Sequence, residues 1–273
     1  MPEAQDIQRV VEELSAHLRQ RPPAPFVSSL APLPLSPTTV STAPVPPERL
    51  QGPADLAPYI DHTLLKPEAT REDVLRVARE AAAHGFATVC VNSCHVAAAA
   101  SVLGGSTTVP IAVVGFPLGA TLTSAKVFEA REALLAGARE IDMVLNVGAL
   151  KGRDYALVFH DIAGVVDACR PLPVKVILET CLLTQDEKIA ACVLARAAGA
   201  TFVKTSTGFG SGGATEEDVA LMRRVVGDAV GVKASGGIRS AEDALRMLRA
   251  GANRLGASAS VSIVRGQQST AKY

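Results

Sequence analysis

The sequence contains no tryptophan, and only 4% of its residues are aromatic. Proteins that hold single-stranded nucleic acids stack the bases on aromatic side chains, so this scarcity argues against that class. Lysine plus arginine and aspartate plus glutamate number 27 each, which leaves no net charge. The balance argues against nucleic acid or an anionic membrane surface as a partner.

Long apolar runs are also missing, because none reaches the length of a membrane span and no signal-peptide core opens the chain. Acidic residues occur early, which disfavours an organelle transit peptide. We therefore expect a cytoplasmic protein that does not insert into a membrane.

The cysteines are odd in number, include no CxxC pair and lie mostly in apolar runs. This usage is typical of reduced, buried thiols in a cytosolic protein. Cys90, Cys94 and His95 lie close in sequence, but no second ligand pair follows them. They therefore give little support for a metal site.

Proline is concentrated before residue 59, where twelve of the seventeen prolines lie. Residues 22–47 carry no acidic or basic side chain, and such a proline-rich segment favours an extended linker. Residues 3–20 place apolar side chains at helical spacing. We predict a short amphipathic helix within 1–21 and a linker over 22–54. The helix either docks on the main domain, contacts a partner or has no detectable role, and the last is the simplest expectation.

From about residue 55, short aliphatic runs alternate with alanine-rich helical stretches that open on capping residues such as Thr70, Thr184, Thr215 and Ser240. Eight such units predict a (β/α)8 TIM barrel over 55–265, with a proline-rich extension before it and a tail over 266–273. An open doubly wound sheet is the alternative, but no GxGxxG follows the first strand. The predicted strands are 58–63, 86–92, 109–116, 140–146, 173–180, 201–206, 229–235 and 252–258.

Two lysines, Lys204 and Lys233, lie near the ends of consecutive predicted strands, which would be about 5 Å apart. Functional groups of such barrels gather at the carboxyl ends of the strands. Two ammonium groups in a pocket partly shielded from water disfavour each other, so at least one pKa should fall from about 10.4. A neutral amine attacks carbonyls and forms a Schiff base. The alternative is that each lysine pairs with a carboxylate or binds phosphate.

Asp142 lies in the apolar fourth strand, where a buried carboxylate needs a cation such as these lysines. It would transfer protons through a held water or fix the second lysine, and the alternative is a structural ion pair. Loops rich in glycine and hydroxyl groups follow strands six, seven and eight. They predict a phosphate site, although tight turns alone would also require glycine.

Six motifs lie in or beside the predicted strands: YIDHTLLKPEAT, GFPLGATLTSAKVFEA, EIDMVLNVGAL, KVILETCLLT, VKTSTGFGSGGAT and VKASGGIRS. Together they resemble the deoxyribose-phosphate aldolase family over about residues 55–265. The resemblance implies a metal-independent class I aldolase without a cofactor, and a homodimer. Such an enzyme reversibly cleaves 2-deoxy-D-ribose 5-phosphate to acetaldehyde and D-glyceraldehyde 3-phosphate.

By position in these motifs, the resemblance implies that Lys204 forms the Schiff base and that Lys233 lowers its pKa. Asp142 would be the proton donor and acceptor. Further residues are expected to line the pocket or bind the phosphate: Asp61, Thr63, Cys90, Thr207, Gly208, Gly236, Gly237 and Ser258.

Two positions depart from some family members. Phe209 stands where a lysine can follow TSTG, and Ala259 follows Ser258 where serines can be paired. Tyr273 ends a polar tail, for which disorder is the simpler expectation. The alternative is that its phenol enters the site and assists proton transfer, as in some family members.

Other functions fit part of the pattern. A neighbouring one is a Schiff-base aldolase for a different phosphorylated sugar. A phosphosugar-binding protein without catalysis, or an inert barrel, belongs to another class. The set of Asp142, Lys204 and Lys233 argues against a pure binder, because binding alone has no use for a lysine of lowered pKa.

Overall fold

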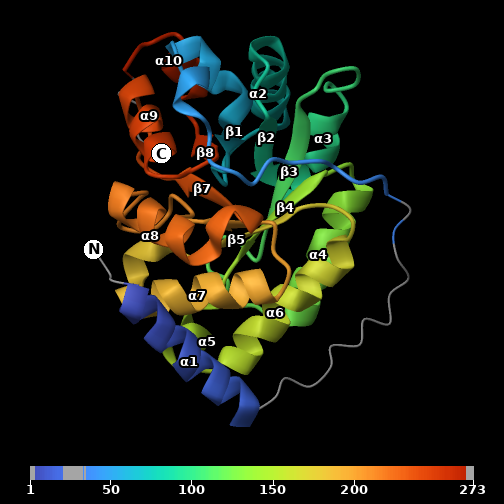
Figure 1. Ribbon diagram of the computed structural model, residues 1–273. Coiled ribbons are helices and arrows are strands. Elements are labelled where there is room, and N and C mark those ends of the chain that lie inside the picture. Colours follow the sequence, from blue (N-terminus) through green and yellow to red (C-terminus); the bar gives the residue numbers. More distant parts are fainter. Residues whose placement is uncertain (1–3, 21–32, 34, 269–273) are drawn as a thin grey trace.

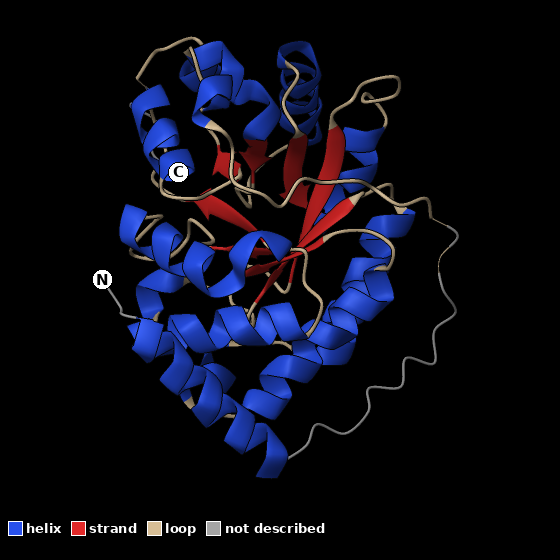
Figure 2. Cartoon of the chain, in the orientation of Figure 1, coloured by secondary structure: helices blue, strands red, loops and turns tan. Residues whose placement is uncertain are grey.

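The computed structural model describes residues 4–20, 33 and 35–268, and its strands close into one parallel barrel (Figures 1 and 2). The strands follow one another in chain order, and β1 pairs with β8 to complete the closure. This confirms the predicted (β/α)8 barrel. The strands are β1 (Ile60–Leu64), β2 (Thr88–Asn92), β3 (Val109–Val114), β4 (Glu140–Val144), β5 (Val174–Ile177), β6 (Phe202–Lys204), β7 (Gly231–Ser235) and β8 (Arg254–Ala257).

Helices surround the barrel, and the predicted capping residues begin four of them (Figure 2). Thr70, Thr184 and Ser240 form capping boxes, and Thr215 accepts the amide hydrogen of Asp218. The helices are α1 (Ala4–Gln20), α2 (Arg71–His84), α3 (Val96–Ala100), α4 (Thr123–Leu135), α5 (Val147–Lys151), α6 (Tyr155–Cys169), α7 (Gln185–Ala197), α8 (Glu216–Val226), α9 (Ala241–Arg249) and α10 (Ser260–Val264).

The apolar core lies between the strands and the helices. Side chains alternate along a strand, so residues such as Val176, Val203 and Val232 face the helices and are buried there. The neighbouring positions Lys204 and Lys233 face the barrel interior instead and are in register with each other. The fold thus places these apolar side chains of β5, β6 and β7 against the helices and the two lysines in the barrel interior.

Helix α1 packs against α6 and α7, so of the three alternatives for this helix the structure shows docking on the main domain (Figure 1). Val10 and Leu14 are buried in this contact, and Arg9 Nη2 lies 2.8 Å from Asp186 Oδ2. An amphipathic helix is stabilised by such burial of its apolar face. The amino-terminal helix is therefore docked on the outside of the barrel.

Part of the predicted linker is held at the amino-terminal end of the barrel. Asn253 Nδ2, just before β8, donates to the carbonyl of Ser41 at 2.5 Å. Thr42 Oγ1 donates to the carbonyl of Asp228, just before β7, at 2.8 Å. The described part of the linker thus has fixed contacts. Within the described ranges, no helix is long and apolar enough to span a bilayer.

Candidate active site

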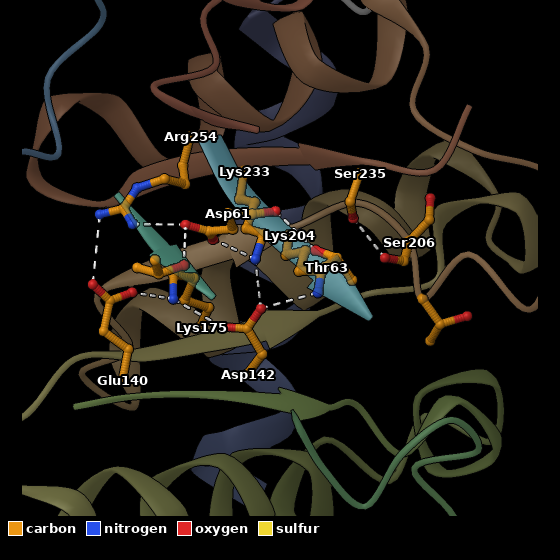
Figure 3. A network of polar contacts seen from close by, with 12 residues as sticks. Asp61, Thr63, Glu140, Asp142, Lys175, Lys204, Ser206, Lys233, Ser235 and Arg254 are labelled. Carbon is orange, nitrogen blue, oxygen red and sulfur yellow. Dashed lines mark hydrogen bonds and ion pairs between the residues drawn. The ribbon is translucent and has the colours of Figure 1, made fainter. Parts of the chain in front are cut away.

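The three groups expected to carry the chemistry meet inside the barrel (Figure 3). Lys204 ends β6, Lys233 lies in the middle of β7, and both are almost completely buried. Lys204 Nζ and Lys233 Nζ donate to the same carboxylate oxygen, Oδ2 of Asp142, at 2.9 and 2.8 Å. The two lysines are therefore held side by side by one acid.

The two lysines differ in their further partners. Burial lowers the pKa of Lys204, the charge of Lys233 lowers it further, and Asp142 only partly opposes this. Lys233 has a second carboxylate, Asp61 Oδ2, at 2.5 Å. Although burial opposes the charge of Lys233, Asp142 and Asp61 raise its pKa. Lys204 is thus the amine that loses its proton more readily, and Lys233 is the fixed cation.

Asp142 has a third cationic partner that the sequence analysis missed. Lys175 on β5 donates to its other oxygen, Oδ1, at 2.8 Å. Burial alone would raise the pKa of Asp142, but the three lysines hold it well below its usual range. The carboxylate is therefore ionised and fixed at both oxygens.

Lys175 and Asp61 lead to two further charged residues that the sequence analysis missed. Lys175 Nζ contacts Glu140 Oε2, and Arg254 Nη1 lies 2.8 Å from Asp61 Oδ1. All these residues occupy inward-facing positions, below the carboxyl ends of the strands. A lysine in the apolar run PVKVILET and an arginine in ANRLGAS are the signals that would have found two of them.

Gly256 on β8 makes room for Lys233. A Cβ atom at this position would lie 3.1 Å from Cε of Lys233 and 2.9 Å from Cβ of Ser235. A glycine is thus required at position 256 by the close approach of β8 to the lysine. The sequence analysis assigned the glycine and hydroxyl residues at the end of the eighth strand to phosphate binding or to a tight turn, and the packing of Gly256 against Lys233 is a further role.

The expected pocket residues take supporting positions. Asp61 accepts from Thr88 Oγ1 at 2.7 Å in addition to its ion pairs, and Thr63 Oγ1 donates to the carbonyl of Asp61 at 2.8 Å. Cys90 lies in a small apolar cluster inside the barrel with Ile111 and Val113. Burial raises the pKa of the Cys90 thiol, which disfavours the thiolate form.

The loops after β6 and β7 come together, as the predicted phosphate site requires. Ala214 N donates to the carbonyl of Gly236 at 3.0 Å, and a Cβ at Gly213 would lie only 2.3 Å from that oxygen. Gly208, Gly236 and Gly237 have φ values of 88°, 85° and 83°, which favour glycine. Ser258 follows β8 and is exposed, while α10 begins two residues later.

Thr207, which is expected to bind the substrate or its phosphate, contacts the carboxylate of Glu179. Its hydroxyl donates to Glu179 Oε2, and its amide nitrogen lies 3.4 Å from both carboxylate oxygens of Glu179. A carboxylate at this distance would repel a phosphate group. Glu179 and Thr207 instead line a pocket of about 330 Å³ with apolar side chains that include Val144 and Phe209.

Another pocket lies apart from the site. A larger pocket of about 440 Å³ lies on the outer surface along α7 and α8, and none of the predicted site residues lines it. Tyr273 falls outside the described residues, so its proposed entry into the site stays a prediction.

The model of the DeoC/LacD family aldolases matches residues 56–267. The chain belongs to this family. A deoxyribose-phosphate aldolase of Macrococcus caseolyticus is 54% identical over 219 residues, which is 80% of this chain and 100% of the relative. One from Streptococcus sanguinis is 56% identical over 215 residues, which is 79% of this chain and 98% of the relative. The protein is therefore an aldolase, a carbon–carbon lyase.

Solved structures agree with this family. A chain from Coccidioides immitis is 41% identical, with a TM-score of 0.78 over 95% of this chain and 96% of that one. A tetrameric deoxyribose phosphate aldolase from Aeropyrum pernix is 31% identical, with a TM-score of 0.75 and 97% of each chain covered. Both cover more of this chain than the family match, which begins at residue 56.

Proposed function

We propose that this aldolase reversibly cleaves 2-deoxy-D-ribose 5-phosphate to acetaldehyde and D-glyceraldehyde 3-phosphate through a Schiff base on Lys204. The observation that carries the proposal is the pair of buried lysines on one carboxylate oxygen, of which Lys204 has the lowered pKa. The curated relatives named deoxyribose-phosphate aldolase support the same substrate.

In the direction of cleavage, the neutral Nζ of Lys204 attacks the aldehyde carbon of the open-chain sugar. Loss of water gives a protonated imine, which withdraws electrons from the neighbouring carbon. The C2–C3 bond breaks as the C3 hydroxyl loses its proton, and the bonding electrons form an enamine on the two-carbon fragment. D-glyceraldehyde 3-phosphate leaves, the enamine takes up a proton at carbon, and water releases acetaldehyde.

Asp142 with a held water takes and returns the protons of these steps. The three lysines keep its carboxylate ionised, and Lys233 keeps a positive charge beside Lys204 without competing as a nucleophile. The phosphate would be bound by the loop amides at Gly208, Gly236 and Gly237 and by the exposed hydroxyl of Ser258. Because Ala259 supplies no hydroxyl and Thr207 faces Glu179, binding would depend mainly on backbone amides.

Borohydride trapping with acetaldehyde, followed by peptide mass mapping, tests the proposal. We expect a two-carbon adduct on Lys204, none in Lys204→Leu and slower trapping at neutral pH in Lys233→Leu. A folded protein that binds phosphate and gives no adduct would contradict the Schiff base. Trapping with acetaldehyde as the donor also separates this function from an aldolase that uses another donor.

We also propose that the protein forms the homodimer that the family resemblance implies. The Aeropyrum pernix relative is described as a tetramer. Sedimentation velocity on the full-length protein separates the two states.

A further inference from the structure

Six buried side chains form a closed ring of ion pairs at the centre of the barrel, here called the charge ring (Figure 3). Around the ring, Arg254 pairs with Asp61 at 2.8 Å, Asp61 with Lys233 at 2.5 Å and Lys233 with Asp142 at 2.8 Å. Asp142 continues to Lys175 at 2.8 Å, Lys175 contacts Glu140, and Glu140 returns to Arg254 at 3.6 Å. The members are Asp61, Glu140, Asp142, Lys175, Lys233 and Arg254.

Cations and anions alternate around the charge ring, so its three positive and three negative groups cancel. Lys204 lies outside this neutral ring. Among the described residues, Asp142 is the only one that forms an ion pair with Lys204. All seven side chains are at most 9% exposed. A proton on Lys204 therefore gives the cluster a net charge of one where water cannot solvate it, which is unfavourable.

We propose that Glu140, Lys175 and Arg254 are positioning residues of the aldolase, which complete the charge balance of the ring and thereby hold Lys204 as the neutral amine. This inference rests on the Schiff-base role of Lys204 proposed above. Lys175 occupies Oδ1 of Asp142 and leaves Oδ2 to Lys204 and Lys233. Glu140 and Arg254 in turn neutralise Lys175 and Asp61.

The ring makes opposite predictions for two of its members. Lys175→Met leaves the ring with a net negative charge, which favours the protonated form of Lys204. The midpoint of the Lys204 titration then rises by about one pH unit. Glu140→Gln leaves a net positive charge, and the midpoint falls by about the same amount. A residue with only a packing role would not shift the midpoint in opposite directions.

The midpoint is measured in the full-length protein without any turnover. Lys204 is reductively methylated with formaldehyde and cyanoborohydride over a pH series, and the modified fraction is quantified by peptide mass mapping. The pH profile of kcat/KM for 2-deoxy-D-ribose 5-phosphate is recorded in parallel. Lys175→Arg keeps the charge, so it should keep the midpoint of the wild type.

The double variant Lys175→Met/Glu140→Gln is the decisive control, because it removes one cation and one anion. Its Lys204 midpoint should return to that of the wild type, whereas independent structural damage would add up. It also remains informative if the single variants do not fold, since its ring has no net charge. The matched pair Lys126→Met/Asp161→Asn removes a buried ion pair outside the barrel wall and should leave the midpoint unchanged.

Each outcome decides the inference. Opposite shifts in the single variants, cancelled in the double variant, support it. Unshifted midpoints, shifts in one direction or a failure of only the double ring variant to fold would overturn it. If the midpoints move as expected and the sugar phosphate is not cleaved, the proposed function fails and the charge balance stands. If the substrate is cleaved through Lys204 and the midpoints do not move, the inference fails alone.

Discussion

The barrel interior and the layer between the barrel and the helices are equally buried, but the pKa values of their carboxylates shift in opposite directions. In the outer layer, Lys126 Nζ pairs with Asp161 Oδ2 at 2.5 Å, and burial still raises the pKa of Asp161. In the interior, Asp142 faces three lysines, which overcome the effect of burial and lower its pKa. One buried partner thus does not compensate for the loss of water, whereas a network of partners does.

The largest expected difference between the two regions is in catalysis. Asp142→Asn removes the group that we propose moves the protons and should lower kcat/KM by about 10³-fold. Asp161→Asn leaves Lys126 buried without its partner and should destabilise the protein by about 3 kcal/mol, with little change in kcat/KM. Steady-state kinetics and urea unfolding measure both variants. A comparable loss of activity in folded Asp161→Asn would show that a carboxylate in the barrel interior matters no more for catalysis than one in the outer layer.

A second expected effect concerns the cation beside Lys204. The charge of Lys233 lowers the pKa of Lys204, so Lys233→Met should raise that pKa and leave less neutral amine at pH 7. We expect kcat/KM at pH 7 to fall by about 10²-fold, equivalent to about two pKa units, and the loss to shrink as the pH rises. The pH profile is compared with that of Lys126→Met, in the outer layer. A loss that is the same at every pH would contradict this role of Lys233.

The same two regions show what could be predicted from the sequence. The alternating runs predicted the barrel and its strands to within a few residues, because the period of apolar residues follows directly from which face is buried. Lys204 and Lys233 were found because they lie near the ends of predicted strands, and Asp142 because a carboxylate in an apolar strand needs a cation. Their catalytic roles stay proposals.

The charge ring could not be predicted in this way. Glu140 and Arg254 each open a strand, and their partners are up to 193 residues away in the chain, as for Arg254 and Asp61. Only closure of the barrel brings β1 beside β8 and makes the ring complete. For the same reason, the apolar positions of α1 predicted an amphipathic helix without showing that α6 and α7 cover its apolar face.

A third expected effect is on stability in acid. The pKa of Asp142 is lowered from its ordinary 3.8, so its stabilising contribution is complete above about pH 4 and is lost as the pH falls further. The pKa of Asp161 is raised, so it contributes in the opposite sense, and protonation in this range favours the folded state.

Removing Asp161 should therefore steepen the loss of stability in acid. Between pH 5 and 3, we expect Asp161→Asn to lose about 1 kcal/mol more than the wild type does. Urea unfolding at each pH measures the difference. If the stability of Asp161→Asn depends less on pH than that of the wild type, ionised Asp161 stabilises the folded protein as Asp142 does.

The smallest expected effect tests whether burial, and not distance, decides how much an ion pair contributes to stability. Arg9 Nη2 and Asp186 Oδ2 are 2.8 Å apart, as are Lys233 Nζ and Asp142 Oδ2, but the Arg9 and Asp186 side chains are 47% and 50% exposed. Water screens such a pair, so Arg9→Ala should have the same urea midpoint and the same kcat/KM as the wild type. Leu14→Ala, on the buried face of the same helix, is the positive control and should lower the midpoint clearly. If Arg9→Ala lowers the midpoint as much as Leu14→Ala, the docking of α1 depends on charge, and exposure does not separate these ion pairs.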